Sequence, residues 1–542
     1  MKDFVFVKND FLVPLPDSIA VCDSDENALV SNQKSDKAQI YAPEINFYLK
    51  NSQDDYLNKA QNTLTLYQVR ASLYDLGLDL EYDKQVGANI IIASKQDKGA
   101  LCEFLGQNGF KALQVGEVLG VYGSVGELGV VINDKGAELD IACDLFLFDE
   151  SKPNFSRQSG CYDLREFSDD NALLAFLQSK SPSYKYKHFI NYDSSICQYA
   201  KRREECCAKC AEICPTTAIV KIDETRELDF SMVDCIGCGD CASICPSGSL
   251  EFTPLPKASF WALLDFYKDK KILLVDENFT LESVEVPLKT GVLPLVLNTA
   301  HLSEMHLLAL LQSSGASLIL CATRLSKGNE EAMSLLNTLF ERKFGKKAIL
   351  WANDAQSLQK AMEQCEFISG LRFEMSQSPM LKREHFAKRL LNLVGEDDFG
   401  VAQSGEWLRY GQVSVDTNTC TLCLACVGAC NVGALVADSK ENALTFNASL
   451  CTTCGYCVAS CAEKDTMSLE RSGLEFRASF FHFRTLARDE LFACVECGKE
   501  FATKKAVERV ADAMKDKFSG DERKLRTLYC CAECKAKLML FG

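Results

Sequence analysis

Histidine is scarce in this chain, since its 542 residues include only five, and none lies at ligand spacing from a cysteine pair. Metal sites that combine histidine with cysteine pairs are therefore not expected. No apolar run approaches the roughly 18–20 residues that cross a bilayer. The first ten residues carry charges inside their apolar stretch, unlike a signal peptide. We expect a cytoplasmic protein without an integral membrane segment.

Signals of catalysis are missing as well. Gly120, Gly123, Gly126 and Gly129 recur every three residues, but strand-like residues 130–132 follow them where a nucleotide-binding loop needs a helix. We predict hairpin turns there, and we find no phosphate-cradling loop and no general acid/base pair. The net charge of −16 argues against non-specific nucleic-acid binding. Whether the chain is an enzyme stays open, and a protein without its own substrate site is favoured.

Cysteine, by contrast, is abundant. The chain contains 28 cysteines, and most of them are separated by two or three residues within clusters. Such spacing is typical of metal ligands, whereas a disulfide framework belongs to small secreted domains. The cysteines are therefore expected to bind metal in a reducing compartment.

The best-formed cluster is Cys235-x2-Cys238-x2-Cys241-x3-Cys245-Pro246, which has the spacing of bacterial ferredoxins. Three cysteines on one tight loop ligate one [4Fe–4S] cluster, and the fourth ligates a neighbouring cluster. The motif therefore requires a partner motif.

The partner motif lies upstream, where the first ligand position is occupied by Glu204. The missing thiolate comes either from Cys197, which nine residues separate from Cys207, or from the adjacent Cys206. We favour Cys197, because vicinal Cys206 and Cys207 can hardly both point at one cluster. A carboxylate ligand or a three-iron cluster is the alternative. The remaining residues of this motif are Cys207, Cys210, Cys214 and Pro215.

Exchange of the fourth ligands gives two sets of four thiolates. A strand–turn–strand between the motifs, at residues 218–222 and 228–230, suits a ferredoxin hairpin. The expected ligand sets are Cys197, Cys207, Cys210 and Cys245 for one cluster, and Cys214, Cys235, Cys238 and Cys241 for the other.

The same pattern returns later in the chain. Cys430 follows Cys214, and Cys461 follows Cys245, by the same 216 residues, which indicates a duplicated module similar to those of polyferredoxins. Asn431 and Ala462 stand where the usual prolines would fix the turn, so we expect a shift in cluster potential rather than a loss of binding. The expected sets are Cys420, Cys423, Cys426 and Cys461, and Cys430, Cys451, Cys454 and Cys457.

Between the modules, short apolar runs alternate with helical segments, which predicts a parallel sheet with right-handed crossovers. The segment from Leu318 to Asn329, with His306-Leu-Leu-Ala-Leu-Leu before it, resembles the delta subunit of methyl-viologen-reducing hydrogenase. This resemblance implies an α/β fold and electron relay between a hydrogenase or formate dehydrogenase and a heterodisulfide reductase. The family's additional cluster-binding cysteines are absent, and only Cys321 and Cys365 remain, so Cys321 is expected to be a small buried residue. The predicted strands are 271–275, 293–297, 318–322 and 347–351, and the helices are 303–313, 329–343 and 354–365.

Near the end of the chain, two CxxC pairs flank a helical stretch over residues 504–518. Four thiolates in a tetrahedron suit Zn2+, and a rubredoxin-like single iron is the alternative. Cys530 would be spare. Such a zinc-ribbon-like tail resembles iron–sulfur proteins associated with formate dehydrogenases. The expected ligands are Cys494, Cys497, Cys531 and Cys534.

Together these patterns predict a multidomain protein of α+β and α/β type. We expect an N-terminal α/β domain of unknown role, two ferredoxin-like 2[4Fe–4S] modules with a parallel-sheet α/β domain between them, and a small zinc-binding domain. The expected boundaries are 1–187, 188–255, 256–404, 405–475 and 476–542.

The leading functional hypothesis is single-electron relay at low potential between redox protein partners through four [4Fe–4S] clusters. One alternative is an electron-input subunit of a larger oxidoreductase, such as a formate dehydrogenase or a heterodisulfide reductase-like complex. Another is a redox-sensing assembly or accessory factor. The cofactors expected are four [4Fe–4S] clusters and one Zn2+, or a mononuclear iron in its place.

Overall fold

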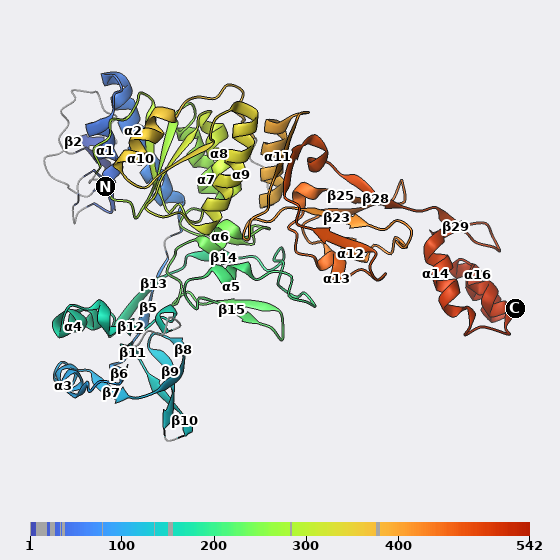
Figure 1. Ribbon diagram of the computed structural model, residues 1–542, viewed down its shortest axis with the longest axis horizontal. Helices are drawn as coiled ribbons and strands as arrows, with labels where there is room; N and C mark the ends of the chain where they lie inside the picture. Colours follow the sequence, from blue (N-terminus) through green and yellow to red (C-terminus); the bar gives the residue numbers. More distant parts are fainter. Residues whose placement is uncertain are drawn as a thin grey trace.

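The computed structural model is a multidomain protein of helices and sheets, in which two cysteine-rich bodies lie beside a central α/β layer (Figure 1). The green body lies below this layer, the orange body lies at its side, and a red tail projects beyond the orange body. No helix in the described part of the chain is long and apolar enough to cross a membrane. The structure describes residues 2–6, 19–21, 28–32, 34, 38–78, 80–134, 136–149, 155–281, 284–375 and 380–541.

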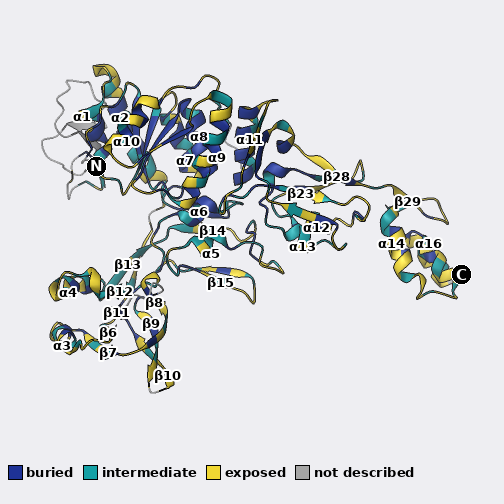
Figure 2. Cartoon of the chain, in the orientation of Figure 1, coloured by how far each residue is buried: buried dark blue, intermediate teal, exposed yellow. Residues whose placement is uncertain are grey.

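The centre is a parallel sheet with strand order β19-β18-β20-β21. Its strands are almost continuously apolar because helices cover the sheet, and Figure 2 shows the buried residues concentrated here. The strands and the later helices lie where the alternating pattern predicted them, whereas the helix over 257–266 was not predicted. They are β18 Lys271–Asp276, β19 Val292–Leu297, β20 Leu318–Cys321, β21 Ile349–Ala352, α7 Lys257–Phe266, α8 Glu304–Ser314, α9 Lys327–Phe344 and α10 Ala355–Gln364.

The beginning of the chain packs onto this central layer. Leu66 and Tyr67 join its core, and Ser52 forms a β-bridge with Leu288. We expected one N-terminal domain over residues 1–187, but the packing divides this range into two parts near residue 77. The elements are β1 Lys2–Phe6, β2 Ile19–Val21, β3 Ala28–Ser31, β4 Ile40–Tyr41, α1 Pro43–Asn51 and α2 Tyr56–Leu76.

The other part of that range forms a separate body with its own two cores. A parallel sheet of order β12-β11-β6-β7 lies beside the antiparallel meander β10-β9-β8. Gly126 lies in a hairpin turn, as predicted, whereas Gly120, Gly123 and Gly129 lie within the hairpin strands. The elements are β5 Glu81–Gln85, β6 Asn89–Ala93, α3 Gly99–Gln107, β7 Lys111–Val115, β8 Val118–Ser124, β9 Glu127–Asp134, β10 Ala137–Cys143, β11 Leu145–Phe148, η1 Phe155–Arg157, β12 Cys161–Asp163, η2 Leu164–Glu166, α4 Asp170–Gln178 and β13 Ser183–Lys187.

The two cysteine-rich bodies share one plan. In each, the first strand pairs with the last and the two middle strands form a hairpin, while a helix of one turn follows each cysteine loop. The first body contains β14 Ile190–Tyr192, α5 Lys209–Ile213, β15 Ile219–Ile222, β16 Glu227–Phe230, α6 Asp240–Ile244 and β17 Leu250–Phe252. The second contains β23 Gln412–Val415, α12 Ala425–Ala429, β24 Leu435–Asp438, β25 Ala443–Phe446, η4 Ala448–Leu450, α13 Tyr456–Ala459 and β26 Met467–Glu470.

Helix α11, Lys382–Val394, joins the central layer to the second body, and the sequence pattern did not predict it. Residues beyond the expected boundary at 475 also belong to the second body, because β28 pairs with β25 and β27 with β22. The tail itself begins near residue 489. These elements are β22 Asp398–Ala402, β27 Leu474–Arg477, η5 Ala478–Phe481, β28 Arg484–Arg488, β29 Leu491–Ala493, β30 Glu500–Thr503, α14 Lys504–Lys515, α15 Glu522–Thr527 and α16 Ala532–Phe541.

Candidate metal centres

Each of the four cysteine loops turns sharply one residue after its second cysteine. The residues at these turns have positive φ, namely Ala208 (85°), Gly239 (83°), Leu424 (59°) and Gly455 (83°). Non-glycine residues pay roughly 1–2 kcal/mol for this conformation. A side chain at Gly239 would also collide with His301, whose Cβ would lie 2.6 Å from the added Cβ. The repeated turn brings the cysteines of each loop onto one side.

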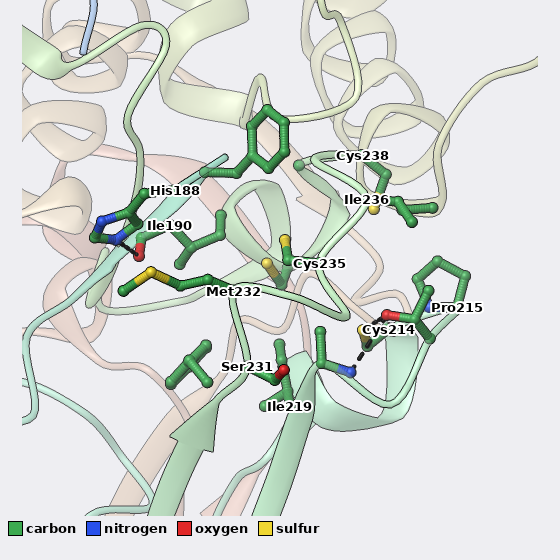
Figure 3. Close-up of a pocket in the computed structure, with 16 residues that line it drawn as sticks. His188, Ile190, Cys214, Pro215, Ile219, Ser231, Met232, Cys235, Ile236 and Cys238 are labelled. Carbon is green, nitrogen blue, oxygen red and sulfur yellow. Dashed lines mark hydrogen bonds between the residues drawn. The ribbon is translucent and has the colours of Figure 1, made fainter. Parts of the chain in front are cut away.

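In the first body, Cys214, Cys235, Cys238 and Cys241 line one cavity together (Figure 3). Cys214 arrives from the other loop, after α5, so this cavity receives the exchanged ligand that the spacing predicted. Apolar residues such as Ile219 and Met232 form much of the remaining wall. A set of four sulfur donors in an apolar cavity fits an iron–sulfur cluster, because thiolates are its usual ligands.

A second cavity in the same body is lined by Cys197, Cys207, Cys210 and Cys245. Cys197 accepts a hydrogen bond at its Sγ from the backbone N–H two residues later, at 3.4 Å. Cys451, the first cysteine of its own loop, accepts the equivalent bond at 3.3 Å. Cys197 therefore has the local geometry of a first-position cysteine.

Cys206 lies apart from that cavity. Burial raises the pKa of the Cys206 thiol to about 11, and the neighbouring Cys454 of the second body adds to the rise. Cys206 thus lies between the two bodies, beside the second body's thiols.

In the second body, Cys420, Cys423, Cys426 and Cys461 line a third cavity, and Cys423 is exposed. The remaining four thiols also lie together. Burial raises the pKa of Cys451 to about 12, and Cys454 and Cys430 raise it further. Burial raises the pKa of Cys457, and Cys451, Cys454 and Cys430 raise it further. The structure thus brings together all four sets expected from the spacing.

Because these thiols are buried close to one another, they lose their protons less readily than the thiol of a free cysteine. Burial raises the pKa of Cys207, Cys238 and Cys426 to about 11 each, and that of Cys210 well above its usual range. A thiolate must be deprotonated to bind metal, so a bound cation compensates this cost and metal binding releases protons.

The two bodies are joined through Asn431, which occupies a position where ferredoxin motifs carry proline. Its side-chain amide donates to the carbonyls of Ser195 (3.1 Å) and Cys197 (3.2 Å) and accepts from Gln198 (2.8 Å). Proline could make none of these bonds. Asn431 therefore ties the second body to the backbone of the displaced cysteine.

Arginines strengthen the same junction. Arg202 donates to the Ala429 carbonyl at 2.7 Å and lies 4.4 Å from the centre of the Tyr456 ring. Burial and Arg409 lower the pKa of Arg471, while thiols from both bodies, Cys207 and Cys454, oppose this shift. One thiol set of each body therefore borders a common positively charged junction.

Helix α11 supports this junction from the central layer. The buried Lys382 ammonium donates to the carbonyls of Ser243 (2.8 Å) and Cys245 (3.0 Å). The Lys382 Nζ atom also lies 3.1 Å from Oε2 of the fully buried Glu304. The two groups form an ion pair, but their geometry is not that of a hydrogen bond. The Tyr410 hydroxyl donates to Glu304 at 3.1 Å. Lys382 thereby fixes the backbone of a fourth-position cysteine.

Replacing Lys382 with methionine should destabilise the protein by roughly 3–5 kcal/mol, because Glu304 would remain buried without its cation. Chemical denaturation of the iron-loaded protein measures this change. Lys388→Met, an exposed position on the same helix, is the matched control and should change stability by less than about 1 kcal/mol. Equal effects of the two substitutions would contradict the role assigned to Lys382.

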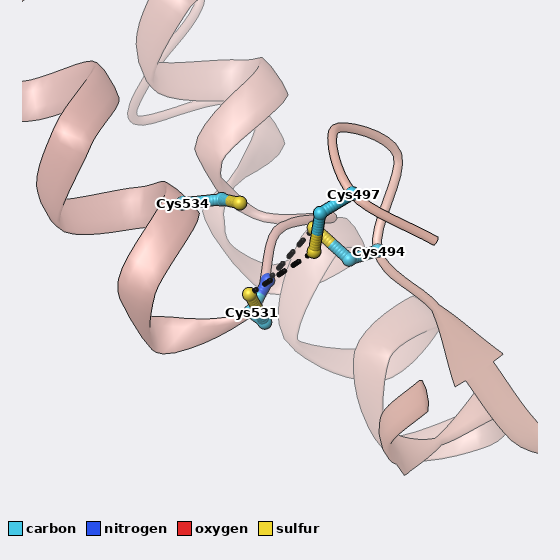
Figure 4. Close-up of side chains that lie close together, drawn as sticks. All are labelled: Cys494, Cys497, Cys531 and Cys534. Atoms are coloured by element: carbon cyan, nitrogen blue, oxygen red, sulfur yellow. Dashed lines mark hydrogen bonds between the residues drawn. The ribbon is translucent and has the colours of Figure 1, made fainter. Parts of the chain in front are cut away.

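The tail contains a different kind of site (Figure 4). The Sγ atoms of Cys494, Cys497, Cys531 and Cys534 all lie within 4.8 Å of one another, and those of Cys497 and Cys531 are 3.7 Å apart. Thiolates about 2.3 Å from a tetrahedral zinc ion are separated by about 3.8 Å. The donor set therefore fits a single metal ion, whereas a four-iron cluster holds its thiolates farther apart.

The tail also stabilises a thiolate. Burial would raise the pKa of Cys494, but backbone N–H groups led by that of Cys531, at 3.3 Å, outweigh this effect and lower it to about 6. Backbone N–H groups that converge in this way favour an anion. Cys530 is buried beside the site and bonds the Arg526 carbonyl at 3.3 Å, outside the set of four.

In the described part of the central layer, Cys321 and Cys365 do not form such a set. Cys321 ends β20 and Cys365 bonds the Ser317 carbonyl at 3.2 Å, and both are buried. Burial raises the pKa of each thiol. Both behave as small core residues.

The residues that join the bodies, above all Arg202 and Lys382, were not predicted from the sequence. Nothing in the local pattern distinguishes them from surface cations. Of the residues that join the bodies, Asn431 could be recognised in the sequence, because it replaces the proline of the motif.

Comparison with known families gives one match. Residues 412–462 match the model of a 4Fe-4S dicluster domain. No curated protein matches the chain. The chain therefore contains a ferredoxin-type domain that binds 4Fe–4S clusters.

Proposed function

We propose that the protein relays single electrons between redox partners through four [4Fe–4S] clusters, arranged in two ferredoxin modules. Iron–sulfur electron transfer is supported by the matched domain at 412–462 and by the thiol sets. The observation that carries the relay is the junction at Asn431 and Arg202, which joins one thiol set of each module. Clusters bound on both sides of this junction would form one path instead of two separate carriers.

The ligand sets proposed are those expected from the spacing, with Cys197 in place of Cys206. The clusters, when bound, supply reversible one-electron reduction. The chain's own residues hold the sulfur atoms, exclude water and donate hydrogen bonds. The backbone N–H groups of Tyr199 and Thr453 donate to the Sγ atoms of Cys197 and Cys451. The buried Ile244 and Leu250 keep solvent from the first module.

Hydroxyl donors suggest a direction of flow. Thr216 lies 3.4 Å from the Cys214 Sγ, and Ser247 lies 3.7 Å from that of Cys245. A ligated thiolate can only accept, so these hydroxyls would donate to it. The equivalent positions in the second module hold Val432 and Glu463. Hydrogen bonds to sulfur stabilise the reduced cluster, so we propose that electrons move from the second module to the first.

The tail is proposed to bind one structural Zn2+ through its four cysteines, with a mononuclear iron as the alternative. It borders the exposed cysteine of the second module, because Thr503 donates to the Thr421 carbonyl at 2.8 Å and Arg509 pairs with Glu463 at 3.4 Å. This placement suits a docking element beside the point where a partner exchanges electrons at Cys423.

The partners proposed are redox proteins such as a formate dehydrogenase or a hydrogenase, as the resemblance of the central layer to a hydrogenase delta subunit implies. Within such an assembly the chain would be an electron-input subunit. Redox sensing as an accessory factor is the second candidate, favoured only by the tail.

Metal analysis of protein purified without oxygen tests the proposal. We expect about sixteen iron atoms and about one zinc per chain, from four cubanes and one tetrahedral site. About eight iron atoms in a folded chain would contradict the claim that both modules are loaded. A seventeenth iron with no zinc would assign the tail to a mononuclear iron.

A further inference from the structure

A cavity beside the first module lies at the carboxyl ends of β18 and β19, outside the thiol-lined sites. Its volume is about 450 Å³, within the range of roughly 300–1,000 Å³ for small-molecule sites. Glu277 and Asn298, which directly follow the two strands, form part of its wall. Ligands of open parallel sheets bind at this edge, beyond the carboxyl ends of the strands.

The opposite wall belongs to the first ferredoxin module. Ile236 and Gly237, which lie between Cys235 and Cys238, line the cavity together with Phe189. The Asn298 amide donates to the Gly237 carbonyl at 3.3 Å and to Glu277 at 3.0 Å. An occupant would therefore contact the loop that holds two ligand cysteines.

Two side chains that line this cavity carry buried polar atoms without a partner in the described part of the chain. His301 is 3% exposed, and neither of its ring nitrogens has a well-aligned hydrogen-bond partner, although the backbone of Asn298 lies close enough to oppose the fall in its pKa. The Oδ1 atom of Asn298 is also buried and unpaired. Leaving such a group unpaired costs about 1–3 kcal/mol. Because these atoms have almost no accessible surface, a ligand would bond to them, and recover this energy, only after the side chains turn toward the cavity.

The chemistry of the wall defines the kind of ligand. The rings of Phe252 and His301 stack, with their centres 4.6 Å apart and an angle of 19° between their planes. Leu73 and Leu297 add apolar surface. Burial lowers the pKa of His301 to about 4, so the ring is neutral at pH 7 and offers one N–H donor and one acceptor. Two cations line the wall, but Arg70 makes a two-point contact with Glu44, and Glu277 on the same wall offsets the charge of Lys187. The lining therefore has no excess positive charge that would favour a phosphate.

We propose that this cavity binds a planar, uncharged, redox-active ring with carbonyl oxygens, of the flavin or quinone class, with His301 donating to a carbonyl. The inference rests on the proposed function, because electrons would come from a reduced cluster held by Cys214, Cys235, Cys238 and Cys241. The ring takes up two electrons, delivered singly, and two protons to give its dihydro form. The protons come from solvent, which reaches the exposed Glu277 at the mouth of the cavity.

Equilibrium dialysis of the iron-loaded full chain against riboflavin or menadione, without oxygen, tests this inference. We expect saturable binding of one equivalent of at least one probe, and the probe that binds identifies the class. His301→Phe keeps the aromatic stack but removes both nitrogens, and it should weaken binding at least tenfold. His482→Phe, at an exposed position in the second body, should bind like the unchanged protein.

A second variant covers the case in which His301→Phe fails to fold. Tyr74 lies at the rim and is 49% exposed, so Tyr74→Ala should leave the fold intact and weaken binding severalfold. Binding of neither probe, or binding that both cavity variants leave unchanged, would overturn the inference. Iron content is measured on the same samples. Low iron with intact ring binding would count against the relay while leaving the cavity assignment in place.

Discussion

Cys197→Ser is expected to lower the iron content by about four atoms per chain, from about sixteen to about twelve, while Cys206→Ser leaves it unchanged. The reason is the position of each sulfur. Cys197 shares a cavity with Cys207, Cys210 and Cys245 and accepts an N–H bond like that of Cys451. Cys206 lies beside Cys454 instead. Iron analysis of both variants, purified side by side without oxygen, gives the answer.

The two variants are matched, because each removes one sulfur from the same short segment. Loss of four irons in Cys206→Ser alone would assign the first ligand to Cys206. Loss of about one iron in Cys197→Ser would indicate a three-iron cluster at this site. Unchanged iron in both would point to Glu204 as the ligand.

Asn431→Pro should loosen the junction between the modules without removing a cluster. The substitution restores the proline of the motif, so the loop remains suited to its cysteine, as at Pro215 and Pro246. It deletes three side-chain hydrogen bonds to the 195–198 segment, each worth about 1 kcal/mol. At 1.4 kcal/mol per factor of ten, opening of the junction should increase on the order of 100-fold.

Hydrogen exchange of backbone amides in residues 195–202 measures this opening. Ala462→Pro restores the other missing proline, at the set that contains the exposed Cys423, and is the control expected to leave exchange unchanged. Both variants should keep the full iron content. Unaltered exchange in Asn431→Pro would show that Asn431 does not hold the modules together.

The grouping of the thiols could be predicted because cysteine spacing fixes loop geometry within a few residues. The choice between Cys197 and Cys206 could not be made from spacing, because an insertion separates the first ligand from its loop. The structure places Cys197 in the cavity of the other three thiols, with the Tyr199 N–H bonded to its Sγ. Asn431 was recognised as a departure, but its bonding partners lie more than 230 residues away.

The domain boundaries and α11 were harder to predict for a different reason. Helix α11 buries Lys382, Arg383 and Arg389, so its charges conceal the apolar face that usually reveals a helix. These cations are stable inside the protein because each has a partner. Backbone carbonyls and Glu304 bind Lys382, and aromatic rings pack against Arg383 and Arg389. Helix α2 likewise gave only a weak signal, although its buried side chains attach the start of the chain to the central layer.

The relay itself is tested most directly by reductive titration of the intact protein, followed by EPR spectroscopy. The account predicts uptake of about four electrons per chain, one for each cluster, with spins that interact within each module and across the Asn431 junction. Asn431→Pro should lose the interaction across the junction and retain that within the modules. Uptake of about two electrons, or magnetically isolated modules in the unchanged protein, would contradict a single path through all four clusters.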